Sequence, residues 1–282
     1  MNKIREYLKH PLSLAVFLLV IISAFITVCA VVFIVVYILV NGVGNLNKEM
    51  FSLEYSTDNL SMLPSIINTL YITFLTLLLA VPIGVFSAVY LTEYARKNSV
   101  FVKIIRITNE TLAGIPSIVY GLFGFLAFVI ARACGYSMIA GVLTLAIMVL
   151  PVIIRTTEEA LLSVDVTYRE GSFALGAGKL RTVFKIVLPT AIPGILSGVI
   201  LATGRIVGET AALIYTAGTV PDAAESLTSS ARTLSVHLYS LLNEGLYTEQ
   251  AYATAVVLLA VVLIINGISG LLAKKLQNRE NV

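Results

Sequence analysis

Glu170-Gly171-Ser172-Phe173-Ala174-Leu175-Gly176 is the most informative stretch of this sequence, and Ile186-Val187-Leu188-Pro189 follows it after nine further residues. The stretch opens with a carboxylate, breaks at a glycine and ends at a Leu-Pro step. It lies between two long apolar segments. This arrangement predicts a polar loop, at about residues 157–189, that is exposed to water and open to contact with another protein.

The composition indicates that the rest of the chain lies in a bilayer. Of 282 residues, 58% are hydrophobic and 12% are charged, and the mean hydropathy is +0.93. A soluble domain carries about 25% charged residues. A chain this apolar cannot cover its surface with polar groups in water, so we expect an all-α integral membrane protein. The net charge of +3 is too small to indicate nucleic-acid binding.

Six apolar segments are long enough to cross a membrane as helices. A helix needs about 20 residues to span the hydrocarbon core. The predicted transmembrane helices are residues 14–40, 65–92, 109–131, 137–156, 190–216 and 250–273.

The basic residues predict the orientation, because cytoplasmic loops of membrane proteins are enriched in lysine and arginine. Fifteen of the 19 fall in the two termini and in two of the loops, whereas Lys48, Arg132 and Arg232 lie on the other side. We therefore expect both termini and the Glu170 loop to be cytoplasmic, and residues 41–64, 132–136 and 217–249 to be outside. Helical spacing of apolar residues at 234–242 predicts a short interfacial or extracellular helix. The fifteen are Lys3, Arg5, Lys9, Arg96, Lys97, Lys103, Arg106, Arg155, Arg169, Lys179, Arg181, Lys185, Lys274, Lys275 and Arg279.

Arg205, Glu209 and Thr210 are candidate substrate-pathway residues in the fifth span. A charge at membrane depth is costly and points to function. Four-residue spacing in a helix would place Arg205 and Glu209 on one face, where they can pair. One interpretation is an ion pair that locks helix packing. The other is an anion-binding arginine, because a guanidinium matches an oxyanion by forked hydrogen bonds. The two interpretations are compatible.

Small residues recur at helical spacing in the same span. Such runs let helix backbones approach closely, so plain helix packing is the first interpretation. A sharper one is that close packing brings Arg205 near the centre of an interface between two subunits. The two runs are Gly194-Gly198-Ala202 and Gly204-Gly208-Ala212.

Gly114, Pro116 and Ser117 predict a bend at the start of the third span, because a proline between glycines interrupts the helix. The bend could serve as a gate. Glu110 precedes it. We interpret Glu110 first as an acid in the first turn of that helix, where the helix dipole favours it, and second as part of an inner gate.

No site for a cofactor, a metal or catalysis is predicted. Gly178-Lys179-Leu180 resembles a phosphate-binding loop, but Phe173 stands where that motif needs its first glycine and Leu180 replaces the hydroxyl residue. Cys29, Cys134, His10 and His237 are widely separated and lack metal-ligand spacing. Because the chain has no machinery to hydrolyse ATP, active transport would need another subunit.

Residues 65–275 resemble the permease domain of binding-protein-dependent ABC importers, which have the type I permease fold with six transmembrane helices. We assign residues 1–64 to an N-terminal tail, the first span and an outer segment, and residues 276–282 to a cytoplasmic tail. Gly171 and Ser172 stand where two alanines are usual in the family's cytoplasmic docking motif. The residues in register with that motif are Glu170, Gly176, Ile186, Leu188 and Pro189.

Two further segments, Leu112–Gly121 and Gly204–Ala211, look like those of phosphate-specific permeases. The short N-terminal tail and Gly208–Ala212 resemble the shorter of the two permeases in that system. The resemblance implies a multi-pass protein of the bacterial cytoplasmic membrane that imports phosphate by alternating access.

The resemblance also implies partners. These are a homologous second permease, two copies of an ATP-binding subunit and an extracytoplasmic phosphate-binding protein. The docking motif would form a coupling helix that the ATPase moves as a rigid body. Glu170 would pair with a basic residue of the ATPase or cap the helix, Gly176 would provide unusual backbone angles, and Arg181 and Lys185 would face membrane lipid headgroups.

Three rival functions remain. A permease for another oxyanion, such as molybdate or sulfate, is a rival of the same class, and uptake assays with competing anions would separate the two. A channel or secondary transporter that works without ATP is disfavoured by the docking motif. A membrane-embedded enzyme is disfavoured because neither histidine lies in a span.

Overall fold

The computed structural model describes the backbone of residues 11–96 and 99–280, and the side chains of residues 12–96 and 99–271. Part of the predicted charge pattern and of the predicted C-terminal tail lies outside the described residues. These parts are Lys3, Arg5, Lys9, Lys97, Asn281 and Val282, and the side chains of Lys274, Lys275 and Arg279.

Helices form every regular element in the described part of the chain. Five of the helical segments are long and apolar enough to cross a membrane, and a bent pair makes a sixth if it is counted as one span. The α-helices are α2 (Pro11–Gly42), α3 (Leu63–Val89), α4 (Val100–Ala113), α5 (Ser117–Gly124), α6 (Met138–Leu162), α7 (Val166–Ala174), α8 (Lys179–Thr182), α9 (Leu188–Val207), α10 (Ala211–Thr216), α11 (Leu234–Glu244) and α12 (Thr248–Glu280).

Short 3-10 and π-helical segments extend or connect these helices. The π-helical ones are continuous with their neighbours, so the second span runs over Leu63–Tyr94 and the fifth over Lys179–Val207. The 3-10 segments are η1 (Val43–Asn45) and η2 (Lys48–Phe51), and the π-helical segments are η3 (Tyr90–Tyr94), η4 (Phe125–Ile130) and η5 (Val183–Val187).

The predicted bounds of two spans were wrong. The third was predicted to start at residue 109, but α4 already begins at Val100 and meets α5 at a bend of 103°. The fifth was predicted to end at residue 216, but α9 ends at Val207 and Gly208 follows it as the cap residue. The short helix predicted at 234–242 is present as α11, and its outer location stays a prediction.

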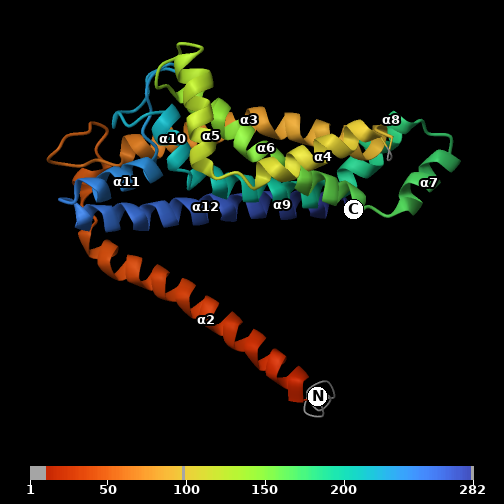
Figure 1. Cartoon of the computed structure of the whole chain (residues 1–282), viewed down its shortest axis with the longest axis horizontal. Coiled ribbons are helices and arrows are strands. Elements are labelled where there is room, and N and C mark those ends of the chain that lie inside the picture. Colours follow the sequence, from red (N-terminus) through yellow and green to blue (C-terminus); the bar gives the residue numbers. More distant parts are fainter. Residues whose placement is uncertain (1–10, 97–98, 281–282) are drawn as a thin grey trace.

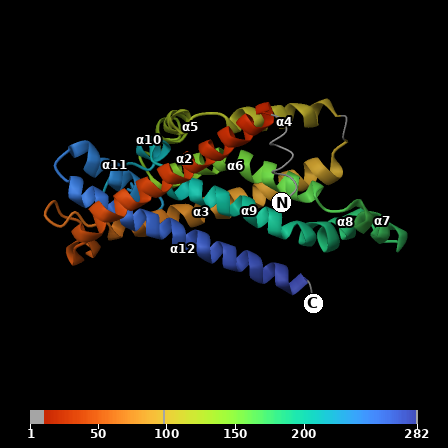
Figure 2. The same cartoon turned by 90° about the horizontal axis from the view of Figure 1, so that it is seen from below.

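Except for α2, the long helices lie side by side, with connecting segments at both ends of the bundle (Figures 1 and 2). Helices α7 and α8 lie at one end of the bundle, and α12 runs toward this same end. At the other end lie α11, the segment around η2 and the chain before α11. The coupling-loop region and the outer segments predicted from the sequence are thus at opposite ends of the bundle.

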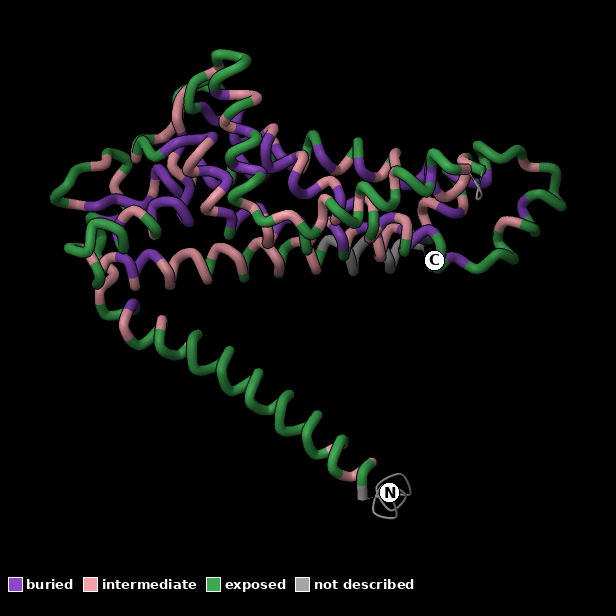
Figure 3. Tube along the Cα trace, in the orientation of Figure 1, coloured by how far each residue is buried: buried purple, intermediate pink, exposed green. Residues whose placement is uncertain are grey.

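Burial is concentrated where α3, α6, α9 and α10 pack together (Figure 3). Ile72, Leu145, Val149 and Ile206 are among the buried residues of this core. By contrast, α2 diverges from the bundle in Figure 1, and no residue of its most apolar window is buried. It meets the rest of the chain near Gly42, where an added Cβ would collide with Tyr252.

One of the two small-residue runs packs helices as predicted. A Cβ added at Gly194 would lie 2.6 Å from the Cβ of Ala160 on α6, and one at Gly198 would collide with Thr156. Glycine therefore permits the close approach of α9 to α6. The second run does not pack helices within this chain, because a Cβ at Gly204 would meet nothing within 4 Å and α9 ends before Gly208. Its role at an interface between two subunits stays a prediction.

The outer segment before α11 is held by polar side chains of α3. The buried amide of Asn68 donates to the carbonyls of Asp222 (3.0 Å) and Arg232 (3.1 Å), and its oxygen accepts from the backbone of Ala224 (2.9 Å). The hydroxyl of Thr69 accepts from the backbone N–H of Leu234 (2.8 Å). These bonds fix the outer segment to one end of α3.

Candidate functional site

Helix α7, which the sequence predicts to be a coupling helix, starts at an aspartate. Asp165 is its N-cap, and its carboxylate accepts hydrogen bonds from the backbone N–H and the hydroxyl of Thr167, both at 2.9 Å. The backbone bond, and then the hydroxyl bond, lower the pKa of this exposed carboxyl. The capping role considered for Glu170 therefore belongs to Asp165.

The other residues of the predicted motif lie on α7 and just after it. Glu170 and Gly171 are exposed, and Glu170 has no hydrogen bond or ion pair among the described residues. Ser172 is buried, and its hydroxyl lies 2.8 Å from the hydroxyl of Thr182 on α8. Glu170 is thus free for a partner, whereas Ser172 closes the loop onto its own second half.

Gly176 has the positive φ expected of it, at +80°. Its N–H donates to the carbonyl of Phe173 (2.9 Å), and the next N–H, of Ala177, donates to the carbonyl of Ser172 (3.1 Å). This left-handed turn ends α7 and directs the chain back to α8. Non-glycine residues reach such angles at a cost of about 1–2 kcal/mol.

The second half of the motif is helical. Ile186 is in η5, and Leu188 and Pro189 begin α9, all three half-buried. Pro189 fits there because the first turn of a helix needs no N–H from it. A hollow of about 290 Å³ separates this part from the turn after α7. Its lining residues are Ser172, Leu175, Gly176, Ala177, Arg181, Lys185 and Ile186.

Apolar side chains are exposed around this hollow, although the loop is outside the bundle. Leu175 is 91% exposed, Leu180 68% and Phe173 48%. Large apolar residues that cluster on a projecting loop indicate a protein contact surface.

Arg205 lies half-buried in the last turn of α9. Among the described residues, no ion pair or hydrogen bond of its side chain is found. The C-terminal end of a helix favours a cation, which gives Arg205 a structural reason as well as a functional one.

The predicted pairing of Arg205 with Glu209 was wrong. Because α9 ends at Val207, the two residues do not share a helical face. The buried carboxylate of Glu209 instead accepts a hydrogen bond from the backbone N–H of Ala212 (3.1 Å) in α10. The backbone carbonyl of Glu209 accepts one from the hydroxyl of Ser235 (2.6 Å). The hydroxyl of Thr210 donates to the carbonyl of Gly208 (3.4 Å). Glu209 therefore orders the chain after α9, and Arg205 has no counter-ion among the side chains that the structure describes.

The bend at Gly114, Pro116 and Ser117 joins α4 to α5. Gly114 follows the last residue of α4, Pro116 is the N-cap of α5 and Ser117 is its first residue. The hydroxyl of Tyr120 donates to the carbonyl of Leu112 (2.8 Å) across the bend. This bond links the two helices across the bend.

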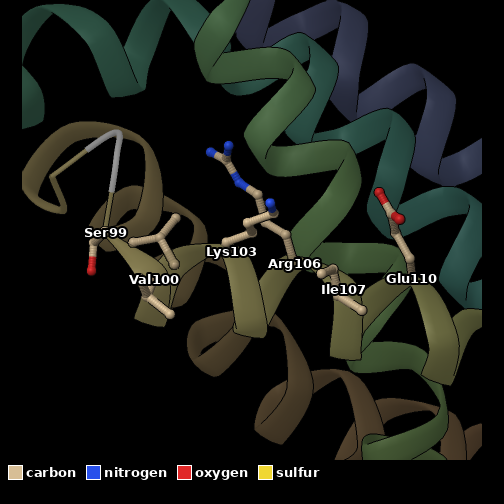
Figure 4. A pocket seen from close by; sticks show the side chains of 7 residues that line it. Ser99, Val100, Lys103, Arg106, Ile107 and Glu110 are labelled. Carbon is tan, nitrogen blue, oxygen red and sulfur yellow. The ribbon is translucent and has the colours of Figure 1, made fainter.

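The interpretation of Glu110 as a first-turn acid was wrong. It lies near the C-terminal end of α4, where the helix dipole disfavours a carboxylate. Figure 4 shows it on the side of α4 that also carries Lys103 and Arg106. These residues line a hollow of about 470 Å³.

Arg106 of α4 also forms an ion pair with Glu158 of α6 (3.2 Å), which links the two helices at this point.

Sequence reasoning missed one strong contact of α7. The guanidinium of Arg169 donates through Nη2 (2.7 Å) and Nε (3.2 Å) to the same carboxylate oxygen of Glu93. Glu93 lies in η3, at the end of the second span. A partner 76 residues away has no signal in the local pattern. The closest hint in the sequence is the position of Arg169, directly before Glu170 of the docking motif.

The outer segment contains a buried histidine. Arg232 lies over the ring of Tyr55 at 5.5 Å, and its Nη1 donates to Nδ1 of His237 (3.4 Å). Burial, and then the charge of Arg232, lower the pKa of His237 from 6.5 to about 4, against a smaller opposite effect from the backbone of Leu60.

Acidification is expected to loosen this outer segment. Because the pKa of His237 is lower in the folded state, its neutral form stabilises the fold above pH 6.5, and this stabilisation is lost as the pH falls toward 4. The full difference is about 3 kcal/mol. Hydrogen exchange of residues 219–237 measured at pH 7 and pH 4.5 checks this. His237→Gln, which does not titrate, should flatten the pH dependence, and an equally steep dependence in that variant contradicts the assignment.

Within the residues described, no group of three or more His, Cys, Asp and Glu side chains lies close enough together to hold a metal ion.

Comparisons with known proteins give a consistent result. Residues 80–278 match the model of the family described as binding-protein-dependent transport system inner membrane component. A probable ABC transporter permease protein, YqgI of Bacillus subtilis (strain 168), is 37% identical over 248 residues, which cover 82% of this chain and 84% of that protein. The phosphate transport system permease protein PstA 2 of Mycobacterium bovis is 36% identical over 205 residues, covering 71% and 67%.

Solved structures of importers share the fold. A bacterial ABC transporter that imports the acidic polysaccharide alginate matches with a TM-score of 0.63 and 16% identity, covering 98% of this chain and 99% of that one. The inward-facing MetNI methionine ABC transporter matches with a TM-score of 0.59 and 19% identity, covering 76% and 94%. At these identities the likeness concerns the fold alone.

Proposed function

The chain belongs to the family of binding-protein-dependent transport system inner membrane components, the permeases of ABC importers. We propose that it moves inorganic phosphate into the cell by alternating access. The observation that carries this substrate is the 36% identity to a permease named for phosphate transport. Arg205 supports it, because a guanidinium without a counter-ion is free to accept a tetrahedral oxyanion. Glu209 and Thr210 order the chain beside it.

The proposed assembly contains a homologous second permease, two ATP-binding subunits and an extracytoplasmic phosphate-binding protein. The exposed apolar surface around Gly176, together with the unpartnered Glu170, supports contact with the ATP-binding subunit. The bend between α4 and α5 is the proposed gate. Both termini and α7 are proposed to be cytoplasmic because the basic residues concentrate there.

Phosphate uptake into vesicles that contain the assembled transporter tests this function. We expect uptake of labelled phosphate only with ATP and the binding protein, and we expect a tenfold excess of unlabelled phosphate to suppress it by about tenfold. The same excess of sulfate or molybdate should leave it nearly unchanged. Competition by those anions would instead favour another oxyanion permease. Uptake without nucleotide would favour a channel or a secondary transporter.

A further inference from the structure

Arg169 differs from its neighbours on the coupling helix. Nearly all side chains of α7 are exposed, but that of Arg169 is only 17% exposed and that of its partner Glu93 only 10%. A charge pair at this depth is screened much less than a surface pair. The chain therefore places one strong ionic contact between α7 and the bundle.

The guanidinium of Arg169 joins three elements at once. Besides Glu93 of η3, it donates through Nη2 to the carbonyl of Leu161 (2.9 Å) in α6 and through Nη1 to the carbonyl of Val164 (2.9 Å), just after α6. The last carbonyls of a helix have no partner within it, so these bonds satisfy groups that the chain leaves free. Arg169 fixes α7 to the ends of both the second and the fourth spans.

The contact with α6 adds little to the covalent connection, because α7 directly follows α6 along the chain. The contact with η3, by contrast, joins α7 to a helix that is distant in the sequence. Among the described residues, the bonds to Glu93 are the only hydrogen bonds or ion pair between α7 and the second span. A weaker contact lies beside it, where the ammonium of Lys179 on α8 is 5.1 Å from the ring centre of Tyr94.

The second span reaches from this contact to the outer segment. It is continuous over Leu63–Tyr94, 32 residues, which corresponds to about 48 Å. Its far end carries Asn68 and Thr69, which hold the backbone of residues 222–234. Although Pro82 lies inside it, the span stays continuous, so it offers a direct path by which a displacement of its inner end can reach the outer segment.

We propose that the Arg169–Glu93 ion pair is the positioning contact through which movement of the coupling helix drives the second span and, through Asn68 and Thr69, the outer segment. This inference rests on the proposed function as an ATP-driven importer. Neither residue contacts the substrate. Their role is to carry the displacement of α7 beyond the two spans to which the loop is covalently joined.

The test uses the complete transporter with Glu93→Gln, which keeps the side-chain shape and removes the charge. The matched control is Glu159→Gln, because Glu159 pairs with Arg155 at 3.0 Å on the exposed surface of α6 and joins no second element. Two quantities are measured for each. One is phosphate moved per ATP hydrolysed, and the other is the change in hydrogen exchange of residues 219–234 when ATP is bound.

For Glu93→Gln we expect normal copurification with the ATP-binding subunit, phosphate moved per ATP lower by about tenfold, and a lost nucleotide response of residues 219–234. Glu159→Gln should match the unmodified transporter in both. An unchanged ratio together with an unchanged response in Glu93→Gln overturns the proposal. A purely stabilising ion pair would change the yield of the complex and leave both quantities intact.

A second pair of variants keeps the test possible if the transporter with Glu93→Gln does not assemble. Glu93→Asp keeps the charge, and Arg169→Lys keeps the charge but loses the fork that reaches Leu161 and Val164. We expect Glu93→Asp to retain more of the nucleotide response than Arg169→Lys, and equal responses at the unmodified level overturn the proposal. Failure of the proposed function looks different, because the unmodified transporter would then respond to ATP at residues 219–234 without moving phosphate.

Discussion

Replacing Arg205 with alanine is expected to reduce phosphate uptake by about 100-fold while the complex still assembles. The lost interaction is a charge-assisted, forked hydrogen bond to an oxyanion, for which about 3 kcal/mol is typical. Assembly should survive because Arg205 makes no ion pair or hydrogen bond in the described part of the chain. Uptake of labelled phosphate and copurification of all subunits measure the two effects separately.

Two controls separate charge from geometry at this position. Arg205→Lys keeps the positive charge without the planar fork, so its uptake should fall between those of the unmodified protein and Arg205→Ala. Arg155→Ala removes an arginine from the exposed surface of α6 and should leave uptake unchanged. Normal uptake by Arg205→Ala would remove this residue from the phosphate route.

Replacing Gly176 with alanine is expected to weaken copurification of the ATP-binding subunit by about tenfold, and Gly176→Val to weaken it further. No atom lies within 4 Å of a Cβ added here, so the effect comes from the φ of +80° and not from a collision. A strain of about 1–2 kcal/mol shifts the conformational equilibrium of the turn by a factor of about 5–30.

Gly171 provides a matched control for this change. A Cβ added there also meets nothing within 4 Å, but the residue lies inside α7 with ordinary helical angles. Gly171→Ala should therefore bind the ATP-binding subunit as the unmodified chain does. Equal binding by Gly171→Ala and Gly176→Ala would show that the turn conformation does not matter for this contact.

The elements that follow local rules were predictable from the sequence. Runs of apolar residues located the spans, proline between glycines located the bend of 103°, and the glycine at position 176 has the expected positive φ. The prediction that Arg205 pairs with Glu209 was wrong because it overlooked a local signal in the sequence. Gly208 is a typical residue for ending a helix, and it interrupts the four-residue spacing.

The contacts between distant segments were not predictable in this way. Arg169 pairs with Glu93 across 76 residues, and Asn68 bonds to residues more than 150 positions later. Each side chain has several possible partners of the right charge or polarity. Which one it meets depends on how the helices pack, and a local pattern does not contain that information.

The contact near Gly42 has a consequence for the order in which the protein is made. Gly42 ends α2, whereas Tyr252 and Val256, against which it packs, belong to α12 and are synthesised more than 200 residues later. Their contact can form only after the ribosome has made the intervening helices and the start of α12. The attachment of α2 to the rest of the bundle is therefore expected to be a late step of folding.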